Sequence, residues 1–295
     1  MEDILPFKIE FLACDSMGVR AFSFTVDMDG YVIHVDPGAS LAPRRYGLPP
    51  HILEIEELEK RLELIRDKLS GANSVFISHY HFDHYLRGED AVLYKNKILY
   101  VKDPRKNINF SQRKRSYALF KYDNVKDLAA EINIADSSQY ILPNGAKLEF
   151  SPPVWHGEKG TKLGYVIMMK LEYEGYRLVY TSDVQGPMVE ETLDIITKWK
   201  PHTLIVGGPP VYLAGYKTKT ESVKKGLENL ALLASQPQLK EMIIDHHLLR
   251  SIEYREMMPP ERRDGLRPVT CAEYSGVQPN LLEARRRELW EKESQ

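Results

Sequence analysis

The 295-residue sequence contains only two cysteines, Cys14 and Cys271, which lie far apart in the chain and match no zinc-binding spacing. So few thiols exclude a disulfide-rich secreted scaffold and favour a reducing, intracellular compartment. No apolar run approaches the roughly 20 residues that cross a bilayer. The N-terminal segment MEDILPFKIEFLAC starts acidic and is not typical of a secretory signal. We therefore expect a cytoplasmic protein with no membrane partner.

An excess of charge of one sign is lacking as well. The 40 Lys and Arg residues nearly balance the 42 Asp and Glu residues, so no global field attracts nucleic acid or an anionic membrane. The sequence also shows no internal repeat and no low-complexity linker, which favours one domain over 1–295. Because 43% of the residues are hydrophobic, a chain of this length can bury a sizeable core.

Short apolar runs recur along the chain and predict strands at 19–26, 31–35, 74–78, 98–101, 147–151, 164–173, 176–182, 203–207 and 241–245. The segments DMDG and EG predict two hairpins, between the first two runs and between 164–173 and 176–182. Apolar residues three or four apart predict a helix that ends at Gly71, and Thr218–Glu221 has the capping-box pattern of another helix start. Early hairpins followed by mixed strands and helices indicate two sheets with helices outside.

Polar residues gather where four of the predicted strands end, in the segments HVDPG, SHYHFDH, YTSDVQG and IIDHH. Loops at strand ends on a rigid scaffold are the usual place for chemistry. Four such ends that carry histidine and aspartate predict one shared site.

The SHYHFDH segment has the residue types of a metal site. His79 and His81 are two apart in extended backbone, so their side chains point the same way and form half of a tetrahedral zinc site. Asp83 and His84 lie just past the strand end and can turn toward a neighbouring position. One loop could then supply two ligands to each of two metals. The alternative is a set of surface histidines, which the density of histidine after a buried strand disfavours.

Other strand ends offer the residues that complete both half-sites. His156 in PPVWHGE is the best third ligand for the first metal. Asp183 in VYTSDVQG is the best bridging carboxylate, with a turn-capping aspartate as the alternative. The DHH segment offers the last ligand, for which we favour His246 over His247, and the other histidine or Asp245 can support the ligands from behind.

This ordered motif resembles that of the metallo-β-lactamase superfamily: His79-x-His81-x-Asp83-His84, then His156, Asp183 and His246. Asp36 in HVDPG matches the structural aspartate of that superfamily, and the resemblance covers essentially the whole chain. It implies an αββα sandwich of two mixed β-sheets with helices on the outer faces and the metals at one sheet edge. The segment LAPRRYGLPPH with IIDHHLLR is similar to a branch of uncharacterised archaeal proteins, which implies no particular substrate.

The resemblance implies a hydrolase that uses two divalent metal ions and a metal-bound hydroxide, because metal binding lowers the pKa of water to roughly 7. Asp83 and Asp183 are the expected catalytic carboxylates, which neutralise the cations and orient the hydroxide. Oxygen-reducing di-iron relatives tend to carry Glu at the position of His81. An imidazole there favours hydrolysis and zinc, with iron or manganese as alternatives.

Basic and aromatic residues suggest what the substrate carries. Arg44 and Arg45 follow Asp36 on a loop expected beside the metals, and Tyr212 in GGPPVYLAGY could flank a ligand. The basic stretch 105–126, with interleaved aromatic residues, could track a nucleic-acid strand, although a solvated amphipathic helix is the simpler interpretation. We expect a phosphodiester or other phosphorylated substrate, which is a small molecule or a nucleic acid.

Three other functions remain open at this point. They are a thioester or lactone hydrolase, a mononuclear iron oxygenase, and a non-catalytic metal-binding module. Structural zinc sites are closed by four protein ligands, whereas open sites with shared ligands are catalytic, so the module is disfavoured. The sequence indicates no particular oligomeric state.

Overall fold

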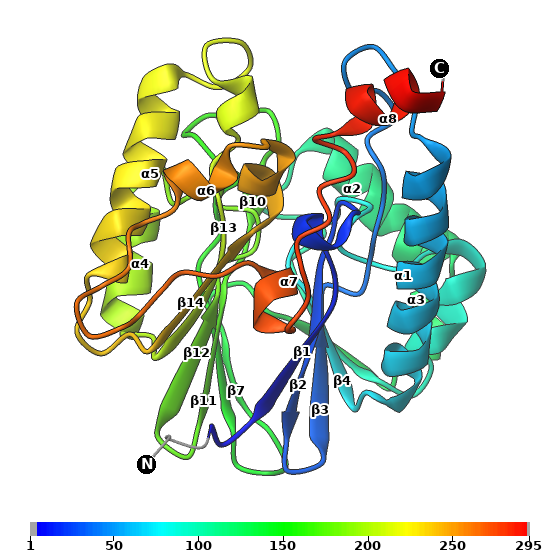
Figure 1. The fold of residues 1–295 in the computed structure, drawn as a ribbon. Helices are drawn as coiled ribbons and strands as arrows, with labels where there is room; N and C mark the ends of the chain where they lie inside the picture. Colours follow the sequence, from blue (N-terminus) through cyan, green and yellow to red (C-terminus); the bar gives the residue numbers. More distant parts are fainter. Residues whose placement is uncertain (1–4, 294–295) are drawn as a thin grey trace.

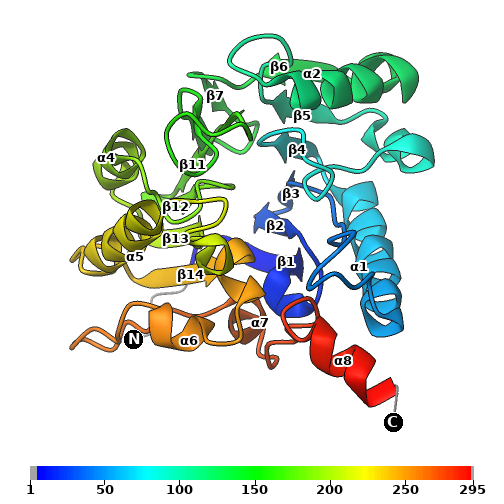
Figure 2. The same cartoon turned by 90° about the horizontal axis from the view of Figure 1, so that it is seen from above.

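Two six-stranded sheets pack against each other in the computed structural model, which describes residues 5–293. Figures 1 and 2 show α1 (Ile52–Gly71) outside the first sheet, and α4 (Glu190–Trp199) and α5 (Thr220–Ala234) outside the second. The layers therefore run helix, sheet, sheet, helix. This order confirms the αββα architecture that we expected.

The first sheet follows the order of the chain, β1-β2-β3-β4-β5-β6. Its first three strands form antiparallel pairs, and β3 to β6 run parallel. The strands are β1 (Lys8–Cys14), β2 (Phe22–Met28), β3 (Tyr31–Val35), β4 (Ser74–Ile77), β5 (Ile98–Val101) and β6 (Glu131–Ile134).

The second sheet has the order β14-β13-β12-β11-β8-β7, with β12, β13 and β14 parallel and the other pairs antiparallel. Its strands are β7 (Gln139–Ile141), β8 (Lys147–Phe150), β11 (Met169–Tyr173), β12 (Tyr176–Tyr180), β13 (Thr203–Gly207) and β14 (Glu241–Asp245). A short antiparallel ribbon lies apart from both sheets and consists of β9 (Val154–Trp155) and β10 (Tyr165–Val166).

Shorter helices complete the fold. They are α2 (Phe110–Tyr117), α3 (Val125–Leu128), α6 (Tyr254–Met257), α7 (Cys271–Tyr274) and α8 (Arg286–Glu293). Four 3-10 segments occupy Asp15–Met17, Gly88–Tyr94, Val211–Leu213 and His246–Arg250, and a π-helical turn, Ala118–Tyr122, extends α2.

An aromatic core holds the two sheets together. Phe24 of the first sheet meets Tyr180 of the second with ring centroids 5.1 Å apart, and Phe76 meets Phe150 at 4.9 Å. All four side chains are buried. Outside the sheets, the apolar face of α1 packs through Ile65 and Leu69 into a second core, which explains the helical spacing in the sequence.

All the predicted strands form, with one interruption and several shifted ends. The run 164–173 is divided into β10 and β11, because the N–H of Ile167 donates to Ser78 O beside the other sheet. The predicted capping box near Thr218 is wrong. Helix α5 begins at Thr220, and its N-cap Lys219 makes no side-chain capping hydrogen bond.

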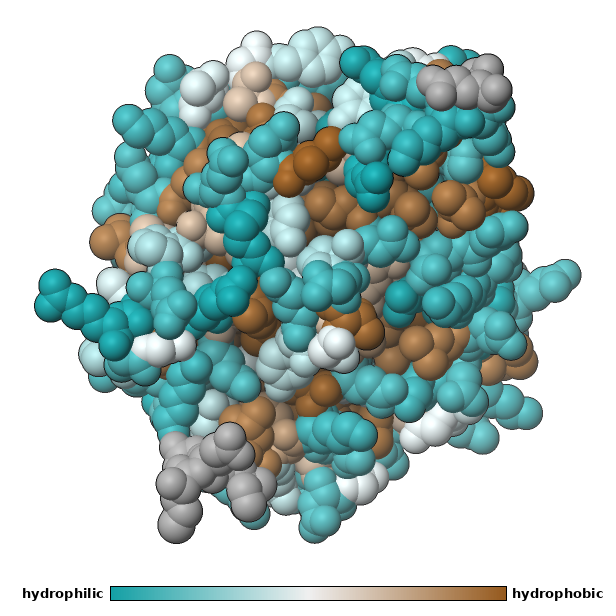
Figure 3. All heavy atoms as spheres, viewed as in Figure 1, coloured by the Kyte–Doolittle hydropathy of each residue, from teal (hydrophilic) through white to brown (hydrophobic). Residues whose placement is uncertain are grey.

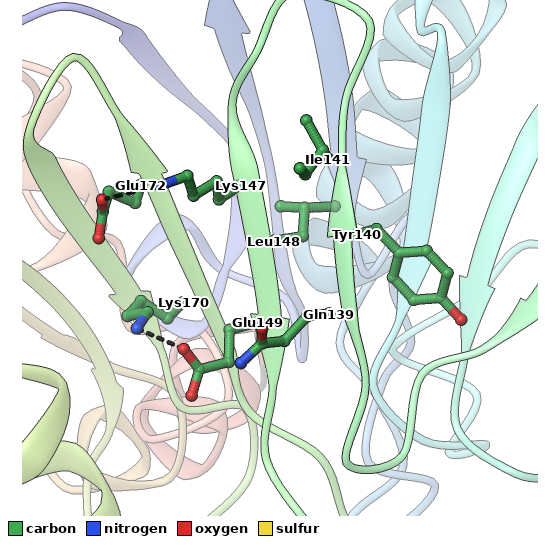
Figure 4. Close-up of a pocket in the computed structure, with 8 residues that line it drawn as sticks. All are labelled: Gln139, Tyr140, Ile141, Lys147, Leu148, Glu149, Lys170 and Glu172. Atoms are coloured by element: carbon green, nitrogen blue, oxygen red, sulfur yellow. Dashed lines mark ion pairs between the residues drawn. The ribbon is translucent and has the colours of Figure 1, made fainter.

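The surface is mixed in character. Figure 3 shows hydrophilic side chains interspersed with smaller groups of hydrophobic ones. A cavity of about 440 Å³ lies over β7, β8 and β11 (Figure 4), where Lys170 pairs with Glu149 and Lys147 lies 3.9 Å from Glu172. The charged side chains of this cavity therefore lie beside partners of opposite charge. No helix within residues 5–293 is both long enough and apolar enough to cross a membrane.

A buried ion pair joins the first turn of α1 to α8. Both Glu54 oxygens lie 2.7 Å from nitrogens of Arg286, and both side chains are fully buried. Replacing Glu54 with Gln leaves the guanidinium buried without a counter-charge. We expect Glu54→Gln to lower the free energy of unfolding by about 3 kcal/mol, measured by chemical denaturation.

The exposed pair Arg285–Glu288, at the start of α8, is the matched control, because both side chains are nearly half exposed. Exposed pairs contribute about 0–1 kcal/mol, so Glu288→Gln should change stability little. Equal losses in the two variants would contradict the importance that we assign to the buried pair.

His34 on β3 predicts a pH dependence of stability. Its Nε2 lies 3.0 Å from Ser23 Oγ, and burial lowers its pKa from 6.5 to about 3. Below pH 6.5 the imidazole of His34 binds a proton in the unfolded chain but stays neutral in the folded protein. The contribution of neutral His34 to the free energy of unfolding is therefore present above pH 6.5 and is lost as the pH falls toward 3. Between pH 7 and pH 5 the loss is about 2 kcal/mol. Denaturation curves should show that this loss of stability between pH 7 and pH 5 is smaller by about 2 kcal/mol in His34→Gln than in the wild type. An equal loss in both proteins would refute the assignment.

Candidate metal centre

The segments that follow β3, β4, β12 and β14 meet at one edge of the sandwich. Together with the loop after β9, they bring close to one another the side chains that the sequence predicts as metal ligands: His79, His81, Asp83, His84, His156, Asp183 and His246. Of these, only Asp83 and His81 are partly exposed.

The predicted ligands form two adjacent groups, and within each group the donor atoms lie within 4.8 Å of one another. The first group contains His79, His81, His156 and Asp183. The second contains Asp83, His84 and His246. Asp183 lies between the groups, since its Oδ2 is 3.1 Å from His156 Nε2 and its Oδ1 is 3.0 Å from His246 Nε2. This is the position that a bridging carboxylate requires.

Asp36 orients part of this cluster from behind. Its Oδ2 accepts hydrogen bonds from His84 Nδ1 at 2.8 Å, Ser78 Oγ at 2.6 Å and Tyr180 OH at 2.6 Å. Because the Nδ1 proton of His84 is held by Asp36, the Nε2 atom faces the site as a donor to metal. Ser78 Oγ gives its only proton to Asp36, so it accepts from His79 Nδ1 at 3.1 Å and frees that Nε2 too.

Asp15 performs the same function for His246 on the other side of the site. Its Oδ2 lies 2.6 Å from His246 Nδ1, and its Oδ1 accepts from Arg250 Nε at 2.6 Å. The sequence analysis did not identify Asp15. No signal near it in the sequence indicates the role, because its partners lie 231 and 235 residues away.

The backbone of the site is unusual. Asp36, Ser182 and His246 have φ angles of 44°, 53° and 65°, in a region that side chains other than glycine rarely adopt. Such strained residues cluster at functional sites. Gly38 follows Asp36, and a Cβ atom there would lie 2.2 Å from the backbone nitrogen of Tyr85. The glycine therefore lets the loop after β3 pass directly over the histidine-rich loop.

The carboxylates and histidines in and around the second group stabilise each other's charged forms. Burial disfavours the charge of His84 and His246, but Asp183 with Asp36 raises the pKa of His84 well above its ordinary value, and Asp183 with Asp15 raises that of His246 to about 9. Burial opposes the charge of Asp183 as well, yet His246 and His84 hold its pKa well below the usual range. The negative charge of these carboxylates therefore favours positive charge beside them. A divalent cation can supply it in place of the protons on His84 and His246.

The first group instead offers neutral imidazoles. Burial lowers the pKa of His79 well below its ordinary value and that of His81 to about 3, and the neighbouring histidines act in the same direction. A neutral imidazole is the form that binds a metal ion.

Unpaired buried atoms show that these residues fit metal ions. Across residues 5–293, nine buried side-chain atoms lack a hydrogen bond of suitable geometry, and three of them are His79 Nε2, His84 Nε2 and Asp183 Oδ1. Leaving such an atom unsatisfied costs about 1–3 kcal/mol. All three belong to the two groups of donors, so cations bound there would satisfy them together.

The two histidines of the DHH segment have different surroundings. His246 Nε2 lies 3.0 Å from Asp183 and 3.9 Å from Asp83, between the carboxylates of the second group. His247 Nε2 lies 3.3 Å from Asp183, and Arg250 Nη1 lies 3.0 Å from its Nδ1. Both histidines belong to one group with Asp183 whose ligand atoms lie within 4.8 Å of one another, so the choice of His246 over His247 stays a prediction.

Asp245 and the two cysteines support the site from below. Asp245 accepts hydrogen bonds from the backbone N–H groups of Ser16, His246 and Cys271. Cys14 and Cys271, remote in the sequence, lie beside it, within a group whose ligand atoms are no more than 4.8 Å apart. Burial raises the pKa of the Cys14 thiol to about 11, so it stays protonated and acts as part of the core.

A cavity of about 660 Å³ opens onto the metal cluster, and its lining includes His81, Asp83, His156, Asp183 and His247. The side chains that we expected to bind substrate lie elsewhere. They are Arg44, Arg45 and Tyr212.

Each of these three side chains has another contact. Arg44 is exposed and hydrogen-bonds to Gly47 O at 3.3 Å. Arg45 stacks 4.2 Å over the ring of Tyr212, and both line a neighbouring cavity beyond Arg250. The loop after Asp36 lines the metal cavity as far as Pro43, but Arg44 and Arg45 lie outside that lining, so adjacency in sequence did not become adjacency in space.

Four other arginines line the metal cavity: Arg20, Arg87, Arg115 and Arg250. The sequence analysis did not name any of these four arginines as a residue of the site. Two signals were present, since Arg87 follows His84 by three residues and Arg115 belongs to the basic stretch 105–126. Residues 110–122 of that stretch form α2 and the π-helical turn, and 125–126 begin α3, so most of the stretch is helical.

Related sequences span almost the whole chain, although it matches no protein-family model. A UPF0282 protein from Aeropyrum pernix is 43% identical over 293 residues, which cover 97% of this chain and 99% of the relative. A UPF0282 protein from Sulfurisphaera tokodaii is 38% identical and covers 97% of this chain and 94% of the relative.

Solved structures share the fold. The metallo-beta-lactamase fold protein YhfI from Bacillus subtilis has a TM-score of 0.53 at 13% identity, with 90% of this chain and 94% of that chain covered. Tm1679, described as a metal-dependent hydrolase of the beta-lactamase superfamily, has a TM-score of 0.51 at 13% identity, with 90% and 96% covered. A diphosphatase from the PhnP family has a TM-score of 0.51 at 16% identity, with 88% and 93% covered. The expected metallo-β-lactamase fold is thereby confirmed.

Proposed function

The chain belongs to the UPF0282 family, and from this premise we propose that it is a metal-dependent hydrolase with a dinuclear centre that acts on a phosphodiester or other phosphorylated substrate. One observation carries the proposal. Asp183 lies between two groups of metal-binding side chains at the base of an open cavity. Shared ligands at a site open to substrate are typical of catalytic rather than structural metal centres.

Each group of donors holds one ion in this proposal. His79, His81 and His156 hold the first, Asp83, His84 and His246 hold the second, and Asp183 contributes to both. When bound, two such ions lower the pKa of water and polarise the oxygen of a phosphoryl or carbonyl group. Zinc suits the imidazole-rich first group, and iron or manganese also accept this set of nitrogen and oxygen ligands.

Other side chains of the cavity control protons and charge. Arg250 Nη1 donates to Nδ1 of His247, which leaves the proton of that imidazole on Nε2, 3.3 Å from Asp183 Oδ2. His247 therefore presents an N–H group at the cavity wall. Asp83 is the partly exposed carboxylate at the cavity and can orient a water molecule there.

The phosphorylated substrate is favoured because arginine guanidinium groups surround the cavity and match phosphate oxygens in geometry. A nucleic-acid substrate has a further observation in its favour. Phe110, Tyr117 and Tyr122 are 82%, 55% and 76% exposed on the helical segment that also carries Arg115 to the cavity. Exposed aromatic rings beside basic residues can stack bases.

We expect about two transition-metal ions per chain, with zinc the most abundant, since a dinuclear centre takes two ions in adjacent positions. Elemental analysis after mild purification measures the stoichiometry, and uptake should weaken at lower pH because the ions displace protons from His84 and His246. A stoichiometry that never exceeds one ion per chain, even with excess metal, would contradict the proposal of a dinuclear centre.

The metal-loaded protein should hydrolyse members of a panel that contains bis(4-nitrophenyl) phosphate, a single-stranded RNA oligonucleotide, a thioester and a lactone. Turnover of the phosphodiesters well above that of the thioester and lactone is the expected result. Faster turnover of the thioester or lactone would contradict the phosphorylated substrate and would support a carboxyl hydrolase instead.

Asp183→Ala should abolish hydrolysis and weaken both metals, because the carboxylate that neutralises both ions is lost. The fold should remain, since β12 and the core beneath Asp183 are unchanged. Metal titration with a melting curve decides the matter, and Asp194→Ala, which removes an exposed carboxylate of α4, is the control. Unchanged metal affinity in Asp183→Ala would show that the residue is no bridge.

A further inference from the structure

Phe82 stacks with two arginines at the metal cavity. The guanidinium carbon of Arg87 is 4.0 Å from the ring centroid of Phe82, and that of Arg115 is 4.5 Å from it. The ring is 38% exposed, and all three residues line the cavity that opens onto the metal cluster. His81 and Asp83 flank Phe82 in the chain. Both guanidinium groups therefore pack on the loop that carries candidate metal ligands.

The charges of the four cavity arginines are balanced differently. Arg20 forms two contacts of 2.6 Å with Glu283, and Arg250 is paired with Asp15. Within the described part of the chain, neither Arg87 nor Arg115 makes an ion pair with a carboxylate.

The contacts of the two unpaired arginines leave their charge available. Arg115 makes one hydrogen bond of 3.4 Å, to the carbonyl of Tyr80, and Arg87 is exposed.

We propose that Arg87, Phe82 and Arg115 form an anion clamp, which binds the non-reacting anionic oxygens of a phosphorylated substrate beside the metal centre. This inference rests on the proposed function. Stacking on an aromatic ring restricts the guanidinium groups before substrate arrives, so less conformational entropy is lost on binding. Two planar forks can then grip the oxygens of one phosphoryl group.

The rest of the cavity wall indicates what the phosphoryl group is attached to. Leu58 and Leu62 of α1, with Leu41 and Leu163, line the same cavity. An apolar lining in the same cavity as an anion clamp fits a phosphoryl ester with an apolar substituent, such as an aryl or alkyl group. A fully polar sugar phosphate would leave this wall without a partner.

Binding of phenylphosphonate to the zinc-loaded protein tests the clamp without requiring turnover. Calorimetry should show Arg87→Ala and Arg115→Ala each weakening binding about tenfold, and the double variant about a hundredfold, as charge-assisted hydrogen bonds are removed. Arg263→Ala removes an exposed arginine outside the cavity lining and should change nothing. The double Gln variant replaces the double Ala variant if the latter does not fold, and metal content is measured in each protein.

Benzoate distinguishes a phosphoryl group from a carboxylate. Phenylphosphonate should bind at least about tenfold more tightly, and the double variant should lose that advantage, because only the phosphoryl group offers three oxygens to two forks. Equal binding of benzoate would overturn the phosphorylated class of substrate. Unchanged phenylphosphonate binding in a folded, fully metallated double variant would overturn the clamp, as would a wild-type protein that binds neither anion.

Failure of the clamp can be distinguished from failure of the proposed function. A wild-type protein that binds phenylphosphonate through the clamp but hydrolyses nothing in the panel supports the clamp and contradicts the hydrolase. A double variant that hydrolyses bis(4-nitrophenyl) phosphate with the wild-type KM retains the hydrolase and contradicts the clamp.

Discussion

The carboxylate of Asp36 holds the two sheets and the metal cluster in one arrangement. It accepts hydrogen bonds from the backbone and hydroxyl of Ser78 beside the first sheet, from Tyr180 of the second sheet, and from His84. A single buried group thus fixes the distance between the sheet edges and the direction of a metal-facing nitrogen. The proximity of the donor groups depends on this constraint, because their members come from loops on both sheets.

Carboxylates behind imidazoles recur across the site. Asp15 supports His246 as Asp36 supports His84, and it also anchors Arg250, which in turn sets the orientation of His247. The outer carboxylates hold the Nδ1 protons, so the Nε2 atoms converge on Asp183. Outer hydrogen bonds of this kind fix the tautomer and orientation of metal-binding histidines.

The arginines around the cavity divide according to their partners. Arg20 and Arg250 are neutralised by carboxylates and hold segments of the fold together, whereas Arg87 and Arg115 are stacked on Phe82 and keep their charge available. Asp83 and Asp183 would balance only part of the charge of two divalent cations bound between them. In the proposal, the unpaired arginines add positive charge at the rim to the charge that the ions would supply to an anionic substrate.

Local signals explain which parts of the fold were predictable. Strands such as 31–35, 98–101, 203–207 and 241–245 have the predicted bounds, because buried strands are continuous apolar runs between turns. The strands β1, β6, β7 and β9 were missed. Of these, β6 and β7 are half-exposed edge strands that carry polar residues and no clear alternation, whereas β1 is mostly buried. Helix α4 was missed as well. The proximity of the candidate metal ligands was predictable because their spacing and order in the sequence form a recognisable motif.

The sequence by itself determined the αββα class, the histidine and aspartate motifs and the chemistry that they favour. Tertiary structure alone decided the partners of those residues. Asp15 reaches His246, Cys14 meets Cys271, and Arg87 and Arg115 stack on Phe82, while the neighbouring Arg45 turns toward Tyr212. The physical reason is that motifs depend on backbone periodicity within a few residues, whereas these contacts depend on how loops from distant strands pack at one edge of the sandwich.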